Sequence, residues 1–415
     1  MSAHVKNLIL VLNCGSSSIK FALFDASVQP LPRQPLWNGK VDGITGPAPT
    51  FGDTGTPPGP VALDAGQPYR AALEHIRTRV RARLDTGGHR LAAVAHRVVH
   101  GGAQYFDPVR VDAAVLADLQ GFIPLAPLHQ PFALEAIEAL LTTAPDLPQV
   151  ACFDTAFHHT LPDVEKMLPL PYSAWERGLR RYGFHGLSYE YLSIALPERY
   201  GDAARGRTLV AHLGSGASLC ALQGLRSVAT TMGFSALDGL MMGTRCGALD
   251  PGAVLYLMQS EKLSPEALGQ LLYHRSGLLG LSGVSSDPRV LLPLEADDAR
   301  VQAALALYVR RAVREIGALV AVLGGLDMLV FTAGIGEHNA TLRARICQGL
   351  AFLGVALDAD ANARHAHRIS STASRVTVAV EPTNEEWIAA RAASRIIPPH
   401  PPFCTPHVPT HPRGC

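Results

Sequence analysis

The sequence has almost no excess charge of either sign. Its 36 lysines and arginines are balanced by 35 aspartates and glutamates, giving a formal net charge of +1 over 415 residues. Binding to nucleic acid or to an anionic membrane surface needs a concentration of positive charge. The composition therefore predicts neither partner. The arginines between 70 and 90 accompany apolar residues at helical spacing, including Ile76 and Val80, and we expect them on the solvated face of a helix.

The sequence also lacks paired cysteine motifs and long apolar runs. Its seven cysteines show no Cys-x-x-Cys spacing, which favours reduced thiols in a cytoplasmic protein over a disulfide framework. The apolar run 8–12 is too short for the core of a signal peptide. The most apolar stretch, 316–330, is interrupted by Gly324, Gly325 and Asp327, so we expect no membrane span.

Two segments about two hundred residues apart do share one pattern. Residues 8–20 and 208–220 each consist of an apolar run, a turn of glycine and serine, and a second apolar run. Each predicts a β-hairpin whose small turn residues let backbone N–H groups approach a phosphate. A matched pair predicts a duplicated domain of α/β class, with phosphates held between the two halves.

The rest of the chain alternates predicted strands with predicted helices. We predict strands at 91–99, 150–153 and 327–331, helices at 111–121 and 301–323, and a surface loop in the Gly- and Pro-rich stretch 45–60. Residues 332–339 place a glycine turn between a strand and a helix that begins near 340, an order typical of nucleotide-binding loops. The Pro- and His-rich stretch 397–415 predicts a disordered tail.

Short motifs along the chain carry a resemblance to a known family. They are Asn13-Cys-Gly-Ser-Ser-Ser-Ile-Lys20, His96-Arg-Val-Val-His-Gly-Gly102, Ala126-Pro-Leu-His129, Phe153-Asp-Thr-Ala-Phe-His158, Tyr182-Gly-Phe-His-Gly186, His212-Leu-Gly-Ser-Gly-Ala-Ser218, Gly239-Leu-Met-Met-Gly-Thr-Arg245, Phe331-Thr-Ala-Gly-Ile-Gly-Glu337 and Pro382-Thr-Asn-Glu-Glu386. With these motifs in this order from residue 8 to about 395, the chain resembles the acetate and propionate kinase (acetokinase) family.

The resemblance implies a fold, an activity and an assembly. The implied fold is the duplicated, ribonuclease H-like one of actin and hexokinase, with a central cleft. One lobe would comprise 1–156 with a helix at about 385–396 packed back on it, and the nucleotide-binding lobe 157–384. The implied activity is the reversible, Mg²⁺-dependent transfer of a phosphoryl group from ATP to acetate, giving acetyl phosphate and ADP and serving acetyl-CoA biosynthesis. Mn²⁺ is the alternative ion, and the implied assembly is a homodimer.

A carboxylate substrate decides what such a site needs. It is already ionised at neutral pH, so no general base is required. The site must instead bring two anions together and stabilise the charge on the equatorial phosphoryl oxygens. The resemblance assigns Arg97 and Arg245 to the acyl phosphate, and His185 and His129 to the phosphoryl oxygens. From the residues alone, His96 and His212 are equally good candidates for a histidine role.

The resemblance also names metal and nucleotide ligands. Asn13, Asp154 and Glu385 would hold the metal, Asp154 also counting as catalytic, although Asp154 and Glu385 could each instead cap a helix. The nucleotide would be bound by Asn13, Ser16, Ser18, Lys20, His212, Gly214, Ser215, Gly216, Asp287, Arg289, Gly334, Ile335, Gly336 and Glu337. Lys20 could alternatively pair with a carboxylate on its own strand.

The acyl pocket and the departures from the family pattern also come from the resemblance. Val99, Leu128, Phe184 and Ala236 take the lining positions, next to Arg97. The family usually has proline at position 236, and the smaller alanine predicts useful activity on propionate beside acetate. Ser215 replaces an asparagine, and Ala229 and Ala248 replace two acidic residues, whose loss would weaken Mg²⁺ binding unless they were structural.

Two other functions compete with acetate phosphorylation. One is a propionate or other short-chain acyl kinase of the same fold. The other is a nucleotide-binding scaffold with little turnover. Retention of Arg97, Asp154, His185, Arg245 and Glu385 opposes the scaffold, because a scaffold has no use for paired arginines that face a small anion.

Overall fold

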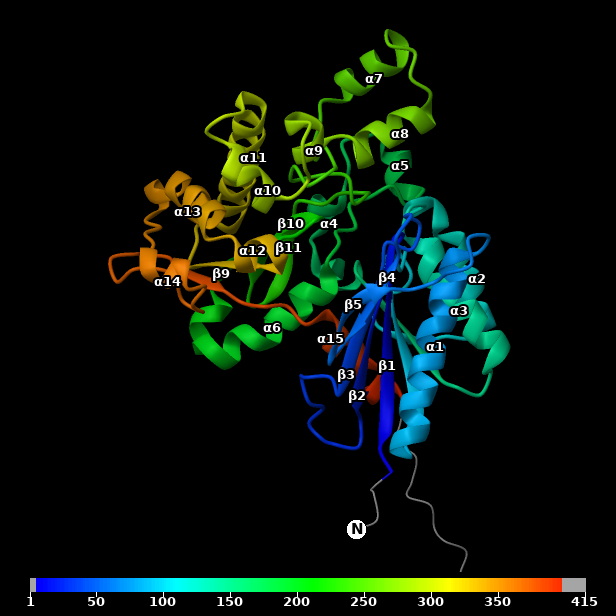
Figure 1. Cartoon of the computed structure of the whole chain (residues 1–415). Coiled ribbons are helices and arrows are strands. Elements are labelled where there is room, and N and C mark those ends of the chain that lie inside the picture. The colour runs from blue at the N-terminus through cyan, green and yellow to red at the C-terminus, as the bar shows by residue number, and fades with distance from the viewer. Residues whose placement is uncertain (1–4, 398–415) are drawn as a thin grey trace, which may run out of the picture.

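The computed structural model describes residues 5–397, which contain two β-sheets flanked by helices (Figure 1). The strand order of the first sheet is β5-β4-β3-β2-β1-β6-β8-β7, and that of the second is β11-β10-β9-β12-β13. The first sheet consists of β1 (Asn7–Cys14), β2 (Ser18–Asp25), β3 (Trp37–Asp42), β4 (Thr50–Asp53), β5 (Thr56–Pro60), β6 (Arg90–Val98), β7 (Val109–Arg110) and β8 (Gln149–Phe153). The second consists of β9 (Arg207–Leu213), β10 (Ala217–Gln223), β11 (Arg226–Thr230), β12 (Met328–Thr332) and β13 (Thr377–Val380).

The two sheets repeat one topology. The order β3-β2-β1-β6-β8 in the first corresponds to β11-β10-β9-β12-β13 in the second. In each, three antiparallel strands are followed by two that join in parallel. Both predicted hairpins are present: the N–H of Gly15 donates to Ser18 O at 2.8 Å, and that of Gly214 to Gly216 O at 3.0 Å. The predicted duplicated α/β fold is confirmed.

Helices cover both faces of the first sheet, which explains why its strands are apolar on both sides. Side chains alternate along a strand, so Leu8, Leu10 and Leu12 face α1 (Pro68–Gly87), α2 (Ala113–Gly121) and α3 (Gln130–Thr143). Ile9 and Val11 face the opposite way and pack on α15 (Glu385–Ile396). The last helix of the described chain therefore completes the core of the first sheet (Figure 1).

The second sheet lies between α6 (Gly186–Tyr200) and α11 (Ala299–Leu323). Tyr189 and Leu192 of α6 pack on this sheet, while Leu187 joins the cluster around α15. Helix α6 thus connects the two halves. The remaining helices are α4 (Asp163–Lys166), α5 (Tyr172–Glu176), α7 (Pro251–Gln259), α8 (Pro265–His274), α9 (Gly277–Ser282), α10 (Pro288–Leu291), α12 (Ala333–His338), α13 (Ala340–Gly349) and α14 (Ala359–Ala363).

Two local predictions are wrong. The stretch 45–60 is not a loop, because β4 and β5 form a hairpin there around Gly55, whose φ is +104°. Its prolines are tolerated because β5 is the edge strand, where a missing N–H breaks no ladder hydrogen bond. The glycine turn at 332–339 is instead the short helix α12.

Several other predictions are confirmed. The arginine-bearing segment forms α1, with Ile76 and Val80 buried, and the predicted helices at 111–121 and 301–323 correspond to α2 and α11. All five cysteines within 5–397 are unpaired, and no helix there is long and apolar enough to cross a membrane. The tail predicted at 397–415 lies outside the described residues from 398 onward.

Candidate active site

Three neighbouring strands of the first sheet bring polar side chains together at their carboxyl ends. Asn13 on β1 lies opposite Arg97 on β6, and Asp154 directly follows β8. Arg97 donates to both oxygens of Asp154, at 2.9 Å from Nε and 2.5 Å from Nη2, and to Asn13 Oδ1 at 3.1 Å from Nη1. Since these bonds use three of its five N–H groups, Arg97 retains two without an acceptor in the described chain.

Glu385 joins this cluster from the first turn of α15. Its Oε2 lies 3.7 Å from Arg97 Nε. The sequence left open whether Glu385 is itself a helix cap. The structure assigns the cap to Asn384, whose side-chain oxygen accepts the N–H of Trp387 at 3.0 Å. The carboxylate of Glu385 is therefore available to the site.

Burial dominates the electrostatics of the Arg97 cluster. It raises the pKa of Asp154, whose side chain is 3% exposed, while the guanidinium of Arg97 opposes that rise. Burial alone would lower the pKa of Arg97, but Asp154 and Glu385 raise it above its usual range. Arg97 is thus a permanent cation enclosed by oxygen acceptors.

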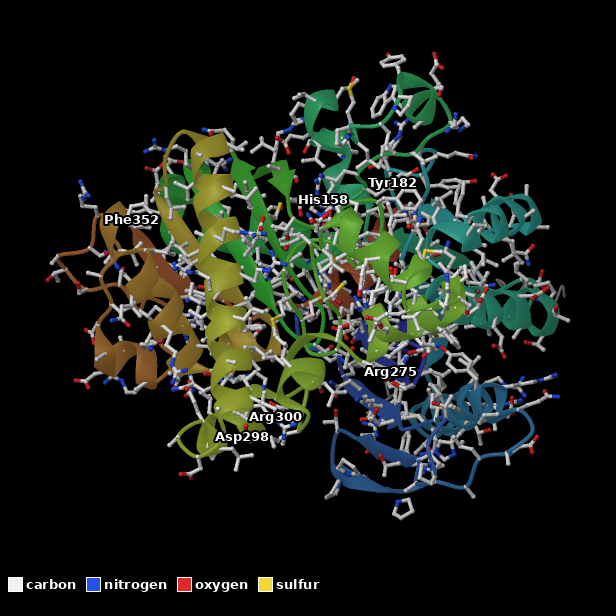
Figure 2. The ribbon with its side chains drawn as sticks, turned by 90° about the horizontal axis from the view of Figure 1, so that it is seen from above. His158, Tyr182, Arg275, Asp298, Arg300 and Phe352 are labelled. Atoms are coloured by element: carbon white, nitrogen blue, oxygen red, sulfur yellow. The ribbon has the colours of Figure 1, made fainter. Side chains whose placement is uncertain are left out.

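His185 reaches the site from the segment that precedes α6. Its backbone is left-handed, with φ +60°, at the N-cap position. His158 supports this segment from behind, because its Nε2 lies 2.9 Å from Phe184 O and its Nδ1 2.9 Å from Ser227 Oγ. The ring of Tyr182, at the start of the segment, packs against His100; His158 and Tyr182 are labelled in Figure 2.

The ring of His185 stacks on His212, with centroids 4.1 Å apart and planes within 14°. Burial, followed by the neighbouring His212 and Arg97, lowers the pKa of His185 well below its ordinary value. Burial, followed by Arg97, lowers the pKa of His212 to about 3. Both rings are therefore neutral near pH 7. His96, in contrast, faces Gln149 at 2.8 Å inside the sheet and is not part of this stack.

Arg245 is a partly buried cation without a carboxylate partner in the described chain. Its Nη1 donates to Ala236 O at 3.1 Å, and its Nη2 lies 3.1 Å from His129 Nε2. Burial lowers the pKa of Arg245, and burial together with Arg245 lowers that of His129 to about 4. A neutral imidazole and a carbonyl leave the positive charge uncompensated, which favours an anionic ligand here.

Gly216 in the second hairpin lies between Arg245 and His185. A Cβ atom at Gly216 would stand 3.3 Å from His185 Nε2 and 3.6 Å from Arg245 Nη1. The absence of a side chain lets these two groups face the hairpin turn together. Ser215, beside it, is exposed, and its carbonyl accepts the N–H of Gly243 at 3.4 Å.

The residues predicted to line the acyl pocket do surround one small cavity. Val99, Leu128, Phe184 and Ala236 line it, together with His129, Tyr273 and residues 125–127. Its volume is about 10 Å³, room for about one water-sized group. Tyr273 was missed from the sequence, since it lies on α8 outside every recognised motif.

The predicted nucleotide-binding loop at 332–339 contains α12, which begins beside the second hairpin. Ala333 has φ +65°, and its Cβ lies 3.6 Å from where a Cβ of Gly214 would be. The side chain of Glu337 accepts the N–H groups of Ala333 at 2.8 Å and Thr383 at 3.3 Å. Glu337 therefore caps α12, the short helix that takes the place of the predicted glycine turn. Gly334 is exposed, with no heavy atom near its missing side chain.

Asp287 and Arg289, also predicted to bind the nucleotide, pair with each other. Asp287 accepts the backbone N–H of Arg289 at 2.9 Å, and its carboxylate receives the guanidinium at 2.6 Å. Arg289 is exposed, while Pro288 between them is buried. Asp287 therefore caps α10, and Arg289 pairs with this cap. Neither residue contacts the Arg97 or Arg245 cluster.

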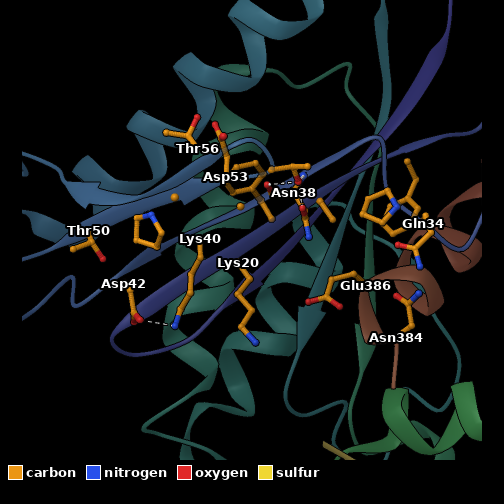
Figure 3. A pocket seen from close by; sticks show the side chains of 18 of the residues that line it. Lys20, Gln34, Asn38, Lys40, Asp42, Thr50, Asp53, Thr56, Asn384 and Glu386 are labelled. Atoms are coloured by element: carbon orange, nitrogen blue, oxygen red, sulfur yellow. Dashed lines mark hydrogen bonds and ion pairs between the residues drawn. The ribbon is translucent and has the colours of Figure 1, made fainter. Parts of the chain in front are cut away.

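The first hairpin is more open than the second. Ser16 and Lys20 are exposed, and Ser18 is partly buried. Lys20 borders a groove of about 660 Å³ along β2–β5, which Thr383, Asn384 and Glu386 also line. Its side chain lies between those of Lys40 and Glu386 (Figure 3). Lys40 pairs with Asp42 at 2.6 Å, whereas Lys20 forms no ion pair with a described residue, so the alternative pairing expected on its own strand is wrong.

Ala248, which stands where the family has an acidic residue, contacts an arginine through its backbone. The guanidinium of Arg311 donates to the carbonyl oxygen of Ala248. Arg311 forms no ion pair with a described carboxylate. Ala248 contacts this arginine and does not contact the Arg97 or Arg245 cluster.

Comparison with known proteins agrees with this geometry. The profile of the acetokinase family matches residues 8–391. An acetate kinase from Rhodopseudomonas palustris is 50% identical over 397 residues, covering 94% of this chain and 99% of that protein. Among solved structures, Porphyromonas gingivalis acetate kinase has a TM-score of 0.83 at 34% identity and covers 94% of this chain and 99% of its own. A propionate kinase from Francisella tularensis has a TM-score of 0.85 at 34% identity, covering 93% and 98%.

The position of Gly216 yields the first testable prediction. Gly216→Ala should lower the rate of phosphoryl transfer roughly several-fold, because the new Cβ would stand 3.3 Å from His185 Nε2 and push that end of the ring away from the turn. The melting temperature should change little, since the displaced group is the end of a side chain. Gly317→Ala on α11 is the control, because no heavy atom lies within 4 Å of its added Cβ. A Gly216→Ala protein with normal turnover would contradict the assignment.

Proposed function

The chain belongs to the acetokinase family, and on this premise we propose that it transfers the terminal phosphoryl group of ATP to acetate, reversibly, giving acetyl phosphate and ADP. One observation carries the proposal: Arg245 is a partly buried cation with no described carboxylate, and it lies beside the neutral donor His185 and the turn at Gly216. Such an arrangement suits a small anion.

The substrate reacts without deprotonation. A carboxylate with an ordinary pKa near about 4 is the ionised nucleophile at neutral pH. The two N–H groups that Arg97 retains are directed to the acyl phosphate oxygens, and Asp154 holds the guanidinium in place. Arg245, with His129 behind it, neutralises charge on the phosphoryl group as it passes in line between donor and acceptor.

The oxygen donors around Arg97 fit a magnesium ion. Asp154 and Glu385 supply carboxylates and Asn13 an amide oxygen, the hard ligands that Mg²⁺ and Mn²⁺ prefer. Within 5–397 no group of three or more acidic, histidine or cysteine residues could form a cage. Mg²⁺ needs only one or two carboxylates beside water and phosphate oxygens. When bound, the ion would neutralise charge on the nucleotide phosphates.

The nucleotide is held across the second sheet. Its phosphates lie along the turn at Gly214–Gly216 and the first hairpin with Lys20, and its adenosine lies over the exposed Gly334 at the start of α12. Residues 1–156 with α15 form one lobe and 157–384 the other. The methyl group of acetate would occupy the acyl cavity, whose lining residues come from both lobes.

The proposal predicts acyl phosphate formation in a hydroxamate assay. Purified protein with ATP, Mg²⁺ and acetate should form acetyl hydroxamate. In a series from formate to butyrate, acetate and propionate should be the best substrates, because one methylene changes binding by only about 1–3 kcal/mol. Arg245→Ala should lower kcat on the order of 10³-fold, since it removes the uncompensated cation.

The controls separate the competing functions. Arg314→Ala on α11 removes an exposed arginine that pairs with Glu315 and belongs to no predicted site, so it should leave kcat unchanged and serves as the control for Arg245→Ala. A protein that binds ATP but forms no acyl phosphate from any acid would support the scaffold and exclude the kinase.

A propionate kinase is the second candidate. The acyl cavity is bordered by Ala236 rather than the family's usual proline, and a propionate kinase is among the structural matches at 34% identity. The carbonyl of Ala236 accepts from Arg245, but its N–H has no hydrogen-bond acceptor in the described chain. Proline at 236 would therefore break no backbone hydrogen bond.

Restoring proline tests the role of this position. Ala236→Pro should lower the propionate-to-acetate ratio of kcat/KM by roughly 3- to 10-fold, because the ring narrows the pocket beside the added methylene. Ala236→Val adds volume without constraining the backbone and should lower the ratio in the same direction. An unchanged ratio in both variants would mean that position 236 does not select the acid. The KM for ATP serves as the control.

We also propose a homodimer in which a second copy covers α7. This apolar helix has no buried residue, and Leu255 and Tyr256 are 54% and 60% exposed. Figure 1 shows α7 at the outer edge of the molecule.

Light scattering after size-exclusion chromatography should give twice the mass of the 44.2 kDa chain. Leu255→Glu with Tyr256→Glu should give a monomer, because two charges would be buried at the interface. Phe352→Glu, at a residue 72% exposed on another segment, should remain dimeric. A monomeric unmodified protein would refute the dimer, and a dimeric α7 variant would refute this location for the interface.

A further inference from the structure

A chain of buried hydrogen bonds lies behind His185. Its Nδ1 is 2.8 Å from Ser218 Oγ on β10, and the same oxygen contacts the hydroxyl of Tyr189 on α6. Both Ser218 and Tyr189 are completely buried. Within the described chain, the Tyr189 hydroxyl has no second hydrogen-bond partner. Among residues 5–397, the Ser218 hydroxyl has hydrogen-bond contacts only with the phenol of Tyr189 and the imidazole of His185.

The number of hydrogens decides which way the chain runs. If Tyr189 donates to Ser218 and Ser218 donates to His185 Nδ1, every O–H has an acceptor. If instead Nδ1–H donates to Ser218, then the hydroxyl proton of either Ser218 or Tyr189 is left without an acceptor in a buried place. An unsatisfied buried donor costs about 1–3 kcal/mol, so the first arrangement predominates.

The tautomer decides what the opposite edge of the ring presents. The pKa of His185 is far below 7, so the ring carries one proton. With Nδ1 accepting from Ser218, that proton is on Nε2, the atom that faces Gly216 and Arg245. The other tautomer would present a lone pair to phosphoryl oxygens and repel them.

We propose that Ser218 is a positioning residue that fixes His185 as the Nε2–H tautomer, so that a neutral imidazole donates a hydrogen bond to the transferred phosphoryl group. Tyr189 holds the Ser218 hydroxyl in the orientation that this requires. The use of the donor rests on the proposed function, whereas the tautomer itself depends only on the buried contacts. His212 stacks on the ring of His185 and bonds separately to Ser188 at 2.9 Å.

Nitrogen NMR of histidine-labelled full-length protein measures the tautomer directly. Two-bond ¹⁵N–¹H spectra distinguish Nε2–H from Nδ1–H, and the His185 signals are identified by their loss in His185→Gln. We expect Nε2–H in the unmodified protein and in Tyr189→Phe, because Ser218 can still satisfy its proton only by donating to Nδ1. We expect a mixture of tautomers in Ser218→Ala. Finding Nδ1–H in the unmodified protein would overturn the proposal, whether or not the protein is active.

Kinetics test the consequence of the tautomer. Ser218→Ala should lower kcat on the order of 10- to 100-fold, typical for removal of a group that orients a functional histidine, with little change in KM for ATP or acetate. Tyr189→Phe should lower kcat only a few-fold. The double variant should equal Ser218→Ala, because Tyr189 acts only through Ser218.

A control separates these effects from general damage to the core. Tyr308 is a buried tyrosine on α11 whose hydroxyl has no partner in the described chain, so Tyr308→Phe should retain normal kcat. Ser218→Ala with kcat within two-fold of normal, or a double variant whose losses multiply, would overturn the proposal.

Discussion

The site depends on enclosing one guanidinium that cannot lose its charge. A buried cation is tolerated only when acceptors surround it, and Arg97 receives them from Asn13 on β1, Asp154 after β8 and Glu385 on α15. Helix α15 packs on the first sheet through its buried apolar face, and this packing brings the carboxylate of Glu385 to the carboxyl ends of the strands.

Arg245, unlike Arg97, has no carboxylate partner in the described chain. It is also partly buried, yet its partners in the described chain are a carbonyl oxygen, the neutral His129 and, at 4.0 Å, the thioether of Met242. The two arginines therefore have different electrostatic states, one compensated and one not. Since an uncompensated cation attracts a negative ligand most strongly, we propose the phosphoryl group as the ligand of Arg245, whereas the charge of Arg97 is shared with its own carboxylates.

The sequence predicted those parts of the fold whose residue pattern lies within one continuous segment. The hairpins at Gly15 and Gly214 followed from apolar runs and small turn residues. The β4–β5 hairpin did not, because its prolines are permitted only by an edge position that the sequence does not reveal. Helix α12 was missed because it needs Glu337 to cap its own first turn.

The candidate site was predictable to the extent that its residues lie in recognisable motifs. Arg97, Asp154 and His185 were named from such motifs, and the structure brings them together with Arg245. The choice between Glu385 as a cap and as a site residue needed the contact of Asn384 with Trp387. Tyr189 gave no signal, because its contact with Ser218 joins a helix to a strand 29 residues away.

The duplication supplies two halves that contribute different chemistry. The first sheet brings carboxylates and an amide around a compensated cation, while the second brings hydroxyls and stacked imidazoles that burial keeps neutral. A reaction between two anions needs cations that stay protonated at neutral pH, as arginine does. It also needs hydrogen-bond donors that are neutral, so that they do not repel one another or the arginines. Protonating both stacked rings would place two like charges 4.1 Å apart beside two arginines. Neutral imidazoles are therefore the form in which this site can hold His185 and His212 beside its two arginines.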